Sequence, residues 1–312
     1  MSTAAGITTQ QKFLDELIAH GHFVPSGEPG LYGRGMVFEQ VRNAVDALVT
    51  RFSAADRPET PRFPPLMPKR ILEKAGYLRS FPQLCGTVFS FSGGDSEAVE
   101  IAERAGRHED WSGCLSGTEV VLVPAACYPA YPAMALRGPL PPDGVNLDLG
   151  GCYVYRHEPS ADPARLQIFH QRELVRIGEA EDVLAWRDKW MTRARGIFQT
   201  AGLNAAIDVA SDAFFGRGGK LLASSQREQR LKFEALVPVA SPSPTAVASF
   251  NFHHEQFGSA FGIRLHDGRT ASSACVGFGL ERITLALFAA HGMDPREWPK
   301  SISDLLGPGK SN

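Results

Sequence analysis

Residues 274–285 read Ala-Cys-Val-Gly-Phe-Gly-Leu-Glu-Arg-Ile-Thr-Leu, and this stretch is the most informative part of the chain. Its first half is an apolar run that predicts a buried strand, interrupted by Gly277 and Gly279. Glycine lets a backbone approach a flat ligand where a Cβ atom would clash. The second half opens an apolar helix with Arg282 in its first turn, where a planar, permanently charged fork can face a phosphate. The stretch therefore predicts a strand, a surface for a flat ligand and a phosphate-binding arginine.

The composition is that of an ordinary globular protein rather than of a nucleic-acid-binding or membrane protein. The chain has 312 residues, 43% hydrophobic and 21% charged, and a formal net charge of −2, which gives no basic field to attract nucleic acid. No apolar run reaches the roughly 18 residues of a membrane span, and the first residues do not resemble a signal peptide. The cysteines are odd in number and scattered, at Cys85, Cys114, Cys127, Cys152 and Cys275. We therefore expect a cytoplasmic protein without a disulfide framework.

Periodicity along the chain predicts an α+β fold. Helical spacing predicts helices over residues 9–21, 36–52, 179–202, 280–291 and 295–306. Strand-forming runs predict strands at 88–92, 119–123, 205–210, 231–239, 247–252 and 262–265, and a strand–loop–strand hairpin over 145–155 and 165–177. Gly93-Gly-Asp-Ser-Glu reads as a turn, and residues 241–245 as a short surface loop. Short connections between strands favour a mostly antiparallel sheet with helices on its faces.

The hairpin carries a second pattern that fits nucleotide chemistry. Arg156 and Glu158 end its first strand, and Phe169 lies on the returning strand. An arginine can offset charge that builds on phosphate oxygens, and an aromatic face can hold a base. On its own, Arg-x-Glu also fits an ordinary surface hairpin.

Together the hairpin and the opening stretch resemble motifs 2 and 3 of the class II aminoacyl-tRNA synthetases. Helix 36–52 and the proline-rich segment after it resemble motif 1, which builds the dimer interface of that family. The resemblance implies the class II catalytic core, mostly antiparallel sheet flanked by helices. It also implies that Arg156 binds the α-phosphate of ATP, Glu158 reads the adenine amino group, Phe169 stacks on the ring and Arg282 holds the γ-phosphate. Arg156 and Arg282 are then the catalytic residues.

Further segments resemble the seryl branch of that class, in the same order along the chain. Leu122-Val-Pro-Ala-Ala-Cys-Tyr-Pro is similar to Leu-Ile-Pro-Thr-Ala-Glu-Val-Pro of that branch, and the Lys-Phe-Glu at 232–234 is similar to its Lys-Tyr-Asp strand. The segment from Ser249 to Gln256 resembles the part of the family that lines the substrate pocket. The resemblance implies ATP binding by Glu234 and substrate binding by Asn251, Gln256, Ala126, Cys127 and Glu173. Small residues at 125, 126 and 274 would leave space for the substrate.

One departure from ordinary seryl enzymes points to zinc. Cys127 stands where those enzymes carry a glutamate for the substrate amino group. With Glu173 and Cys275 it would give three protein ligands and leave a fourth zinc position open for the substrate amine. This set resembles the zinc-dependent seryl-tRNA synthetases of methanogens and their truncated bacterial relatives, the amino acid:[carrier protein] ligases. Without that resemblance, both cysteines also fit as small buried hydrophobes. His253 and His254 are expected to pack or face water.

We expect residues 1–312 to form one class II catalytic domain, with a short N-terminal helical extension over about residues 1–35. That extension is too short for a tRNA-binding arm, so the resemblance implies a carrier-protein acceptor rather than tRNA. The implied reaction activates glycine or alanine with ATP and Mg²⁺, and then transfers it to a phosphopantetheine thiol. A seryl-type tRNA synthetase without its own arm, and a non-catalytic paralogue, stay open as alternatives. The resemblance also implies a homodimer.

The carrier surface is not identified by any motif. Helix 179–202 has an apolar side and basic residues at Arg187, Lys189, Arg193 and Arg195. Carrier proteins are usually acidic around their prosthetic group, so this helix fits either as the dock or as an ordinary solvated amphipathic helix.

Overall fold

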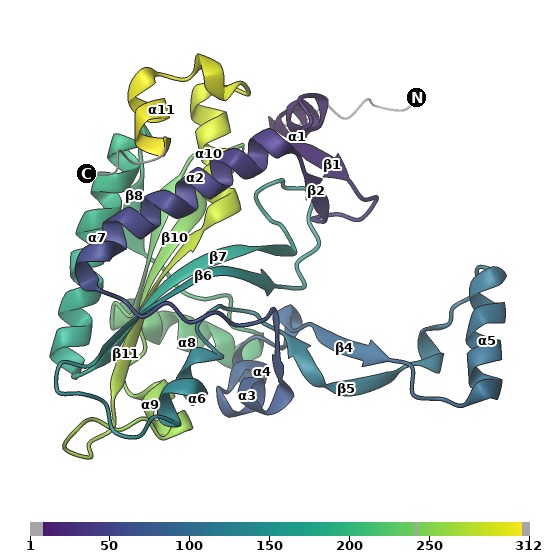
Figure 1. The fold of residues 1–312 in the computed structure, drawn as a ribbon, viewed down its shortest axis with the longest axis horizontal. Coiled ribbons are helices and arrows are strands. Elements are labelled where there is room, and N and C mark those ends of the chain that lie inside the picture. Colours follow the sequence, from purple (N-terminus) through teal and green to yellow (C-terminus); the bar gives the residue numbers. More distant parts are fainter. Residues whose placement is uncertain (1–8, 241–242, 308–312) are drawn as a thin grey trace.

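The computed structural model describes residues 9–240 and 243–307, and its central element is a six-stranded sheet (Figure 1). In spatial order the strands are β6 (Val145–Tyr155), β7 (Ile168–Gly178), β11 (Ser272–Gly279), β10 (Thr245–Phe252), β9 (Lys232–Val237) and β8 (Ala206–Val209). Every neighbouring pair is antiparallel. The expected α+β fold with an antiparallel sheet flanked by helices is therefore confirmed.

The strand register brings the predicted site residues to one face of this sheet. Gly277 on β11 pairs with Glu173 on β7 and with Ser249 on β10, while Cys275 pairs with Asn251. Side chains alternate between the two faces along a strand. Cys275 and Gly277 therefore share a face with their partners, and the residues between them point to the opposite face.

Three helices cover that opposite face: α2 (Met36–Ser53), α7 (Ala180–Thr200) and α10 (Leu280–His291). Arg172 of β7 forms a partly buried ion pair with Asp46 of α2, with 2.7 Å between nitrogen and oxygen. Trp190 of α7 packs edge-on against Phe278 of β11, with ring centroids 6.2 Å apart. These contacts hold the sheet from behind and leave its other face for a site.

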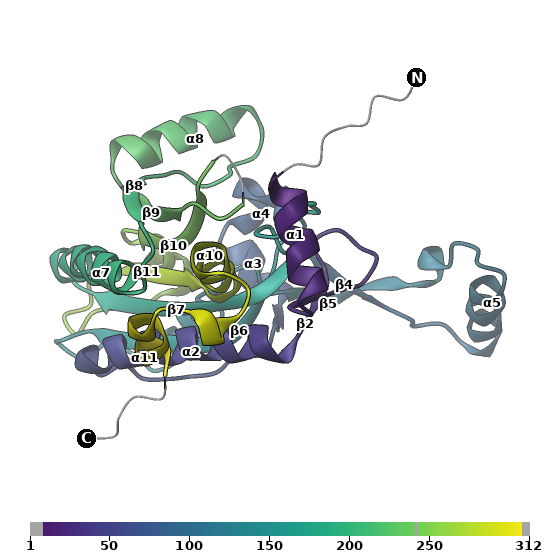
Figure 2. The ribbon, with the colours of Figure 1, turned by 90° about the horizontal axis from the view of Figure 1, so that it is seen from above.

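Short helices border the site face. They are α3 (Lys69–Lys74), α4 (Tyr77–Ser80), α6 (Ala130–Ala135), α8 (Gly216–Glu228) and α9 (Gln256–Phe261). Figure 2 places α8 on one side of the sheet and α2 on the other. The sequence pattern did not predict α8, because Gly216, Gly218 and Gly219 lower the intrinsic helix propensity of its first turns.

The N-terminal segment forms α1 (Thr9–Ala19) and a small sheet of β1 (Phe23–Pro25) and β2 (Tyr32–Arg34). The helices predicted over residues 9–21 and 36–52 are confirmed, as are those over 179–202 and 280–291. The single helix predicted over 295–306 is wrong: a 3₁₀ turn (Pro295–Glu297) precedes α11 (Lys300–Leu306). Pro299 stands between them and cannot donate a backbone hydrogen bond. The strand predicted at 262–265 is reduced to one isolated bridge, at Arg264.

An arm projects from the body (Figure 1). In the chain it lies between β3 (Leu66–Pro68) and β6 of the six-stranded sheet. It contains β4 (Thr87–Ser90), α5 (Asp95–Gly106) and β5 (Ser116–Leu122). The turn predicted at residues 93–97 is wrong, since α5 begins there. The backbone N–H of Gly94 donates to the Glu97 carboxylate at 3.0 Å, and this contact caps the helix start. Residues 241 and 242 of the predicted surface loop lie outside the described residues.

Candidate functional site

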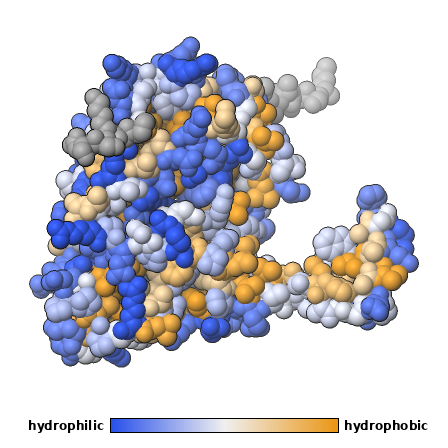
Figure 3. Space-filling model, in the orientation of Figure 1, coloured by the Kyte–Doolittle hydropathy of each residue, from blue (hydrophilic) through white to orange (hydrophobic). Residues whose placement is uncertain are grey.

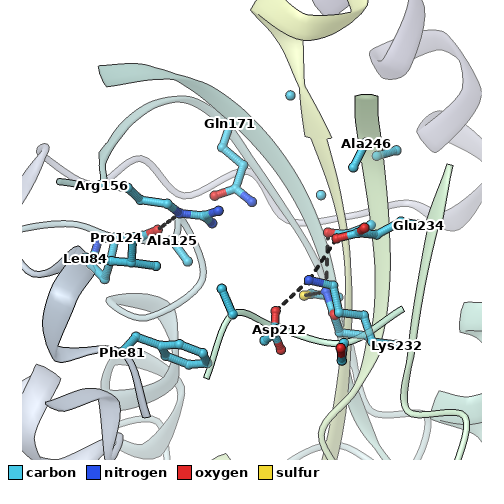
Figure 4. A pocket seen from close by; sticks show the side chains of 18 of the residues that line it. Phe81, Leu84, Pro124, Ala125, Arg156, Gln171, Asp212, Lys232, Glu234 and Ala246 are labelled. Atoms are coloured by element: carbon cyan, nitrogen blue, oxygen red, sulfur yellow. Dashed lines mark hydrogen bonds and ion pairs between the residues drawn. The ribbon is translucent and has the colours of Figure 1, made fainter. Parts of the chain in front are cut away.

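A cavity of about 720 Å³ lies over the exposed face of the sheet. Figure 4 shows Arg156 and Gln171 on one wall, and Asp212, Lys232 and Glu234 on the other. The cavity also borders α8, whose Leu222, Ser225 and Gln226 line it. Of the predicted site residues, all except Ala126 line this one cavity.

Two arginines flank an aromatic ring at one end of the cavity. The guanidinium carbon atoms of Arg156 and Arg282 lie 5.7 and 5.9 Å from the centroid of the Phe169 ring. Residues more than 100 positions apart therefore meet, because β7 and β11 pair directly. A planar ring between two permanent cations fits an adenine base with its phosphates.

Backbone carbonyls hold the Arg282 guanidinium in place. Its Nε donates to the carbonyl of Ala164 at 2.9 Å, and its Nη1 donates to that of Ala246 at 3.1 Å. Burial, with Arg156 and Arg165 close by, lowers the pKa of Arg282 to about 10. A positive group held in this way lacks a carboxylate partner of its own among the described residues, and a polyphosphate would stabilise it.

The two predicted nucleotide-binding glutamates each have a cationic partner. Glu158 forms an ion pair with Arg165 at 2.7 Å, and both side chains are partly exposed at the cavity rim. Glu234 accepts from Lys232 at 3.0 Å. Since the carboxylate of Glu158 is already paired, reading an adenine amino group would use a remaining lone pair.

Lys232 joins two carboxylates in a group that sequence reasoning did not assign. Its ammonium nitrogen lies 2.5 Å from Asp212 and 3.0 Å from Glu234. Gln226 of α8 donates to Asp212 at 2.8 Å and so ties the helix to this group. Burial acts to lower the pKa of Lys232, but the two carboxylates outweigh it and the pKa is raised. The ammonium therefore stays charged and holds β9, the segment after β8 and α8 together.

Cys127, Glu173 and Cys275 meet at the other end of the cavity. All three are buried, and their ligand atoms lie within 4.8 Å of one another. The backbone N–H of Cys127 donates to Glu173 at 2.7 Å, and the amide of Asn251 donates to Cys275 Sγ at 3.3 Å. Two sulfurs and a carboxylate at this separation match the donor set of a zinc site with one open position.

The electrostatics of this cluster favour a cation. A hydrogen bond to Cys127, and burial, raise the pKa of Cys275 well above its usual value. Cys275 acts in the opposite direction on Cys127, but burial and the Glu173 carboxylate outweigh this contact, so that pKa is also raised. Burial raises the pKa of Glu173. Burial disfavours the charged form of all three groups, and a divalent cation would reverse the balance.

Comparison with known proteins identifies the family of the chain. A chain from Bradyrhizobium diazoefficiens named amino acid–[acyl-carrier-protein] ligase 1 is 44% identical over 286 residues, covering 91% of this chain and 87% of its own. This chain belongs to that ligase family. A scan against models of protein families finds no match.

More distant likeness links the ligase to seryl enzymes. The type-2 serine–tRNA ligase of Methanopyrus kandleri is 29% identical over 199 residues, covering 60% of this chain and 37% of the relative. A solved structure of M. kandleri SerRS with A. aeolicus tRNASec superposes with a TM-score of 0.81 at 23% identity, covering 98% of this chain and 62% of that chain. The ligase therefore has the class II synthetase fold.

The remaining predicted substrate residues of the ligase differ in position. Asn251 and Gln256 line the cavity, whereas Ala126 is fully buried behind its wall. The Ala126 backbone N–H donates to Gln171 at 3.3 Å, so its contribution is to hold a wall residue. Ala274 is likewise not a source of space for substrate, because it packs with Val183 on the opposite face of the sheet.

His253 and Tyr131 are site residues that sequence reasoning missed. Nε2 of His253 lies 3.5 Å from Cys275 Sγ, and burial lowers the pKa of this histidine to about 4. Tyr131 is fully buried beside Cys127. The expectation that His253 packs was correct in part, because its ring lies edge-on to that of Phe257. No spacing in the sequence relates His253 to Cys275 or Tyr131 to Cys127. The first contact arises where β10 ends beside β11, and the second arises from the packing of α6.

Helix α7 lies away from the cavity. It packs behind the sheet, and its Arg187 is buried and donates to the backbone carbonyl of Arg230 at 3.0 Å. Arg193 forms an ion pair with Asp56 at 2.7 Å. Two of the four basic residues that suggested a carrier dock thus serve the fold. Within the described part of the ligase, no helix is long and apolar enough to cross a membrane.

Gly277 is the glycine whose missing side chain matters most to the cavity. A Cβ atom there would lie 2.8 Å from Gln171 Nε2 and 3.3 Å from Ser249 Oγ, and Gln171 would have to shift. We expect Gly277→Ala to slow adenylate formation about 10-fold or more, because the wall that orients substrate is displaced. Amino-acid-dependent pyrophosphate exchange measures this effect.

Gly196→Ala on α7 is the matched control. Among the described residues beyond its own helix turn, no atom lies within 4 Å of a Cβ atom placed there, and α7 packs on the face of the sheet away from the cavity. We expect exchange close to the unmodified rate. Equal losses in the two variants would show that crowding at Gly277 is not the cause.

Proposed function

We propose that this ligase activates glycine or alanine as an aminoacyl-adenylate and transfers it to the phosphopantetheine thiol of a carrier protein. One observation carries the proposal. The arginine and phenylalanine group at one end of the cavity and the Cys127, Glu173 and Cys275 cluster at the other share a single cavity. Such a cavity can hold ATP and an amino acid together, with the carboxylate of the amino acid between them.

In the first step an oxygen of the amino acid carboxylate attacks the α-phosphorus of ATP. The bond from that phosphorus to the bridging oxygen breaks, and pyrophosphate leaves. A bound Mg²⁺ would offset negative charge on the phosphates. Arg156 offsets charge on the α-phosphate, and Arg282 holds the γ-phosphate of a bent ATP. In the second step the thiol sulfur attacks the adenylate carbonyl, a thioester forms and AMP leaves.

The Cys127, Glu173 and Cys275 cluster would hold zinc in this scheme. A bound zinc ion supplies an open coordination position for the substrate amine. Recognition by the amine would leave the side chain to be selected by the surrounding space. Tyr128 and Phe257 line the cavity next to Cys127, with ring centroids 5.7 Å apart. Such an aromatic wall limits the space for the side chain of the substrate and therefore favours a small one.

Amino-acid-dependent pyrophosphate exchange tests the activation step. The proteinogenic amino acids are offered one at a time, before and after full removal of zinc. Exchange with glycine or alanine that zinc removal abolishes is the expected result. Exchange that survives zinc removal would overturn the metal assignment, and no exchange with any amino acid would favour a non-catalytic paralogue.

The acceptor is tested separately with tRNA and with a phosphopantetheinylated carrier protein. Transfer to the carrier thiol is expected. Transfer to tRNA alone would favour the seryl-type synthetase, which the partial likeness to type-2 serine–tRNA ligases keeps in view.

We expect the carrier to approach over α8, which borders the mouth of the cavity. Leu221 is 75% exposed on this helix, and Leu222 is 44% exposed and lines the cavity. Arg217 and Lys220 add positive charge near them, which suits an acidic carrier surface. The double variant Arg217→Glu, Lys220→Glu should raise the apparent KM for carrier about 10-fold and leave pyrophosphate exchange unchanged.

The matched control for this prediction is on α7, behind the sheet. Lys189→Glu with Arg195→Glu reverses the same amount of charge far from the cavity mouth. If the α7 pair raises the carrier KM and the α8 pair does not, the dock is α7 and the α8 assignment fails.

The arm and the motif 1-like helix support a homodimer. Phe89, Val99 and Trp111 of the arm are 57%, 59% and 43% exposed, and Figure 3 shows the apolar surface they contribute to. A second copy of the chain would cover this surface. Light scattering that gives the 33.8 kDa mass of one chain would overturn the dimer. The five cysteines are free thiols, which suits a reducing cytoplasm.

A further inference from the structure

Two side-chain nitrogen atoms lie close to the sulfur of Cys275. Its Sγ lies 3.3 Å from Asn251 Nδ2 and 3.5 Å from His253 Nε2. Neither residue is in the set of mutually close ligand atoms formed by Cys127, Glu173 and Cys275. Both therefore contact a ligand of the proposed metal from outside the ligand set.

The surroundings of His253 are compatible with a proton on Nε2. Nδ1 lies 3.0 Å from the hydroxyl of Ser273 and 3.5 Å from that of Tyr131. A hydroxyl can donate its proton to Nδ1, and the neutral ring then carries its only N–H at Nε2. That N–H faces the Cys275 sulfur.

Ser273 is the nearer of the two hydroxyl groups. Its Oγ lies 3.0 Å from Nδ1, against 3.5 Å for the hydroxyl of Tyr131, so Ser273 is the donor assigned to His253 in this inference.

We propose that His253 is a positioning residue of the zinc site, which holds the Cys275 thiolate through Nε2–H and so strengthens metal binding. The inference rests on the proposed zinc site. Two thiolates and a carboxylate within 4.8 Å repel one another. Hydrogen bonds to a thiolate spread its charge and fix its direction, and loss of such outer partners typically costs about 10–100-fold in metal affinity.

Three variants of the full-length ligase separate this role from simple packing. His253→Phe keeps a ring among Tyr131 and Phe257 but removes the donor. His253→Gln keeps a nitrogen donor at a similar reach. The matched control His254→Asn changes the neighbouring histidine, which is exposed and has a positive φ of 50° that asparagine tolerates.

Zinc affinity is measured by competition with a chelator, with thermal unfolding as the check on folding. We expect His253→Phe to weaken zinc binding about 10–100-fold, and His253→Gln and His254→Asn to bind nearly as the unmodified ligase does. Cobalt(II) is a spectroscopic probe of the same site. Its thiolate-to-metal charge-transfer band should shift in His253→Phe and stay in place in His254→Asn.

The outcomes distinguish the inference from the function on which it rests. If the unmodified ligase holds no zinc, the metal assignment fails and this inference fails with it. If the unmodified ligase binds zinc and a folded His253→Phe variant binds it equally well, only the role of His253 is overturned. Should the phenylalanine variant not fold, His253→Leu takes its place in the comparison with His253→Gln, and equal affinities would again overturn the role.

Discussion

Arg282→Lys should reduce amino-acid-dependent pyrophosphate exchange by about 10²–10³-fold, the usual cost of removing one well-placed donor to a developing charge. The carbonyls of Ala164 and Ala246 hold two edges of the Arg282 guanidinium at 2.9 and 3.1 Å. A lysine keeps the charge but cannot make both contacts and also present a planar fork to a phosphate. The charge would then lose its fixed position over Phe169.

Arg176→Lys is the matched control. Arg176 lies on the same strand as Phe169 and makes contacts with Asn146 and Asp143 away from the cavity. Its replacement should leave exchange unchanged. A folded Arg282→Lys variant with exchange near the unmodified rate would contradict the role given to Arg282.

Cys127→Ser and Cys275→Ser should each abolish stoichiometric zinc and, with it, amino acid activation. Serine is nearly isosteric with cysteine but does not ionise at neutral pH and is a poor zinc ligand. Loss of a direct ligand should exceed the ~100-fold upper range for outer partners. Metal analysis and exchange measure the two effects in the same samples.

The pH dependence of zinc binding follows from the same cluster. The pKa values of both thiols and of Glu173 are raised in the metal-free site, so these groups are protonated at neutral pH more than free groups would be. Zinc must displace those protons. Affinity should therefore rise with pH below the thiol pKa values and fall as the solution becomes more acidic.

Cys152→Ser is the control for both measurements. Cys152 is also a buried cysteine, and burial raises its pKa to about 12, but it is not in the ligand cluster. Its replacement should leave zinc content and exchange intact. Retention of zinc in Cys275→Ser together with loss in Cys152→Ser would mean that the cluster has been assigned to the wrong thiol.

The motifs could be identified from the sequence because the residues of each motif lie within a short segment. Strand, glycines and arginine lie within residues 274–285, and the hairpin of β6 and β7 is a local alternation of apolar residues. Where local preference was weak, prediction failed. The glycine-rich start concealed α8, and a turn-like segment concealed the start of α5.

The class of fold, and the residue types expected for ATP and for a thiolate metal site, could be predicted from the sequence alone, since they depend on local pattern and ligand chemistry. Which residues meet depends on the tertiary structure. Pairing of β11 with β7 and β10 brings Cys275 to Glu173 and Asn251, moves Ala274 to the opposite face and places His253 against a sulfur. A one-residue change of register would reverse every one of these assignments, because side chains alternate across a sheet.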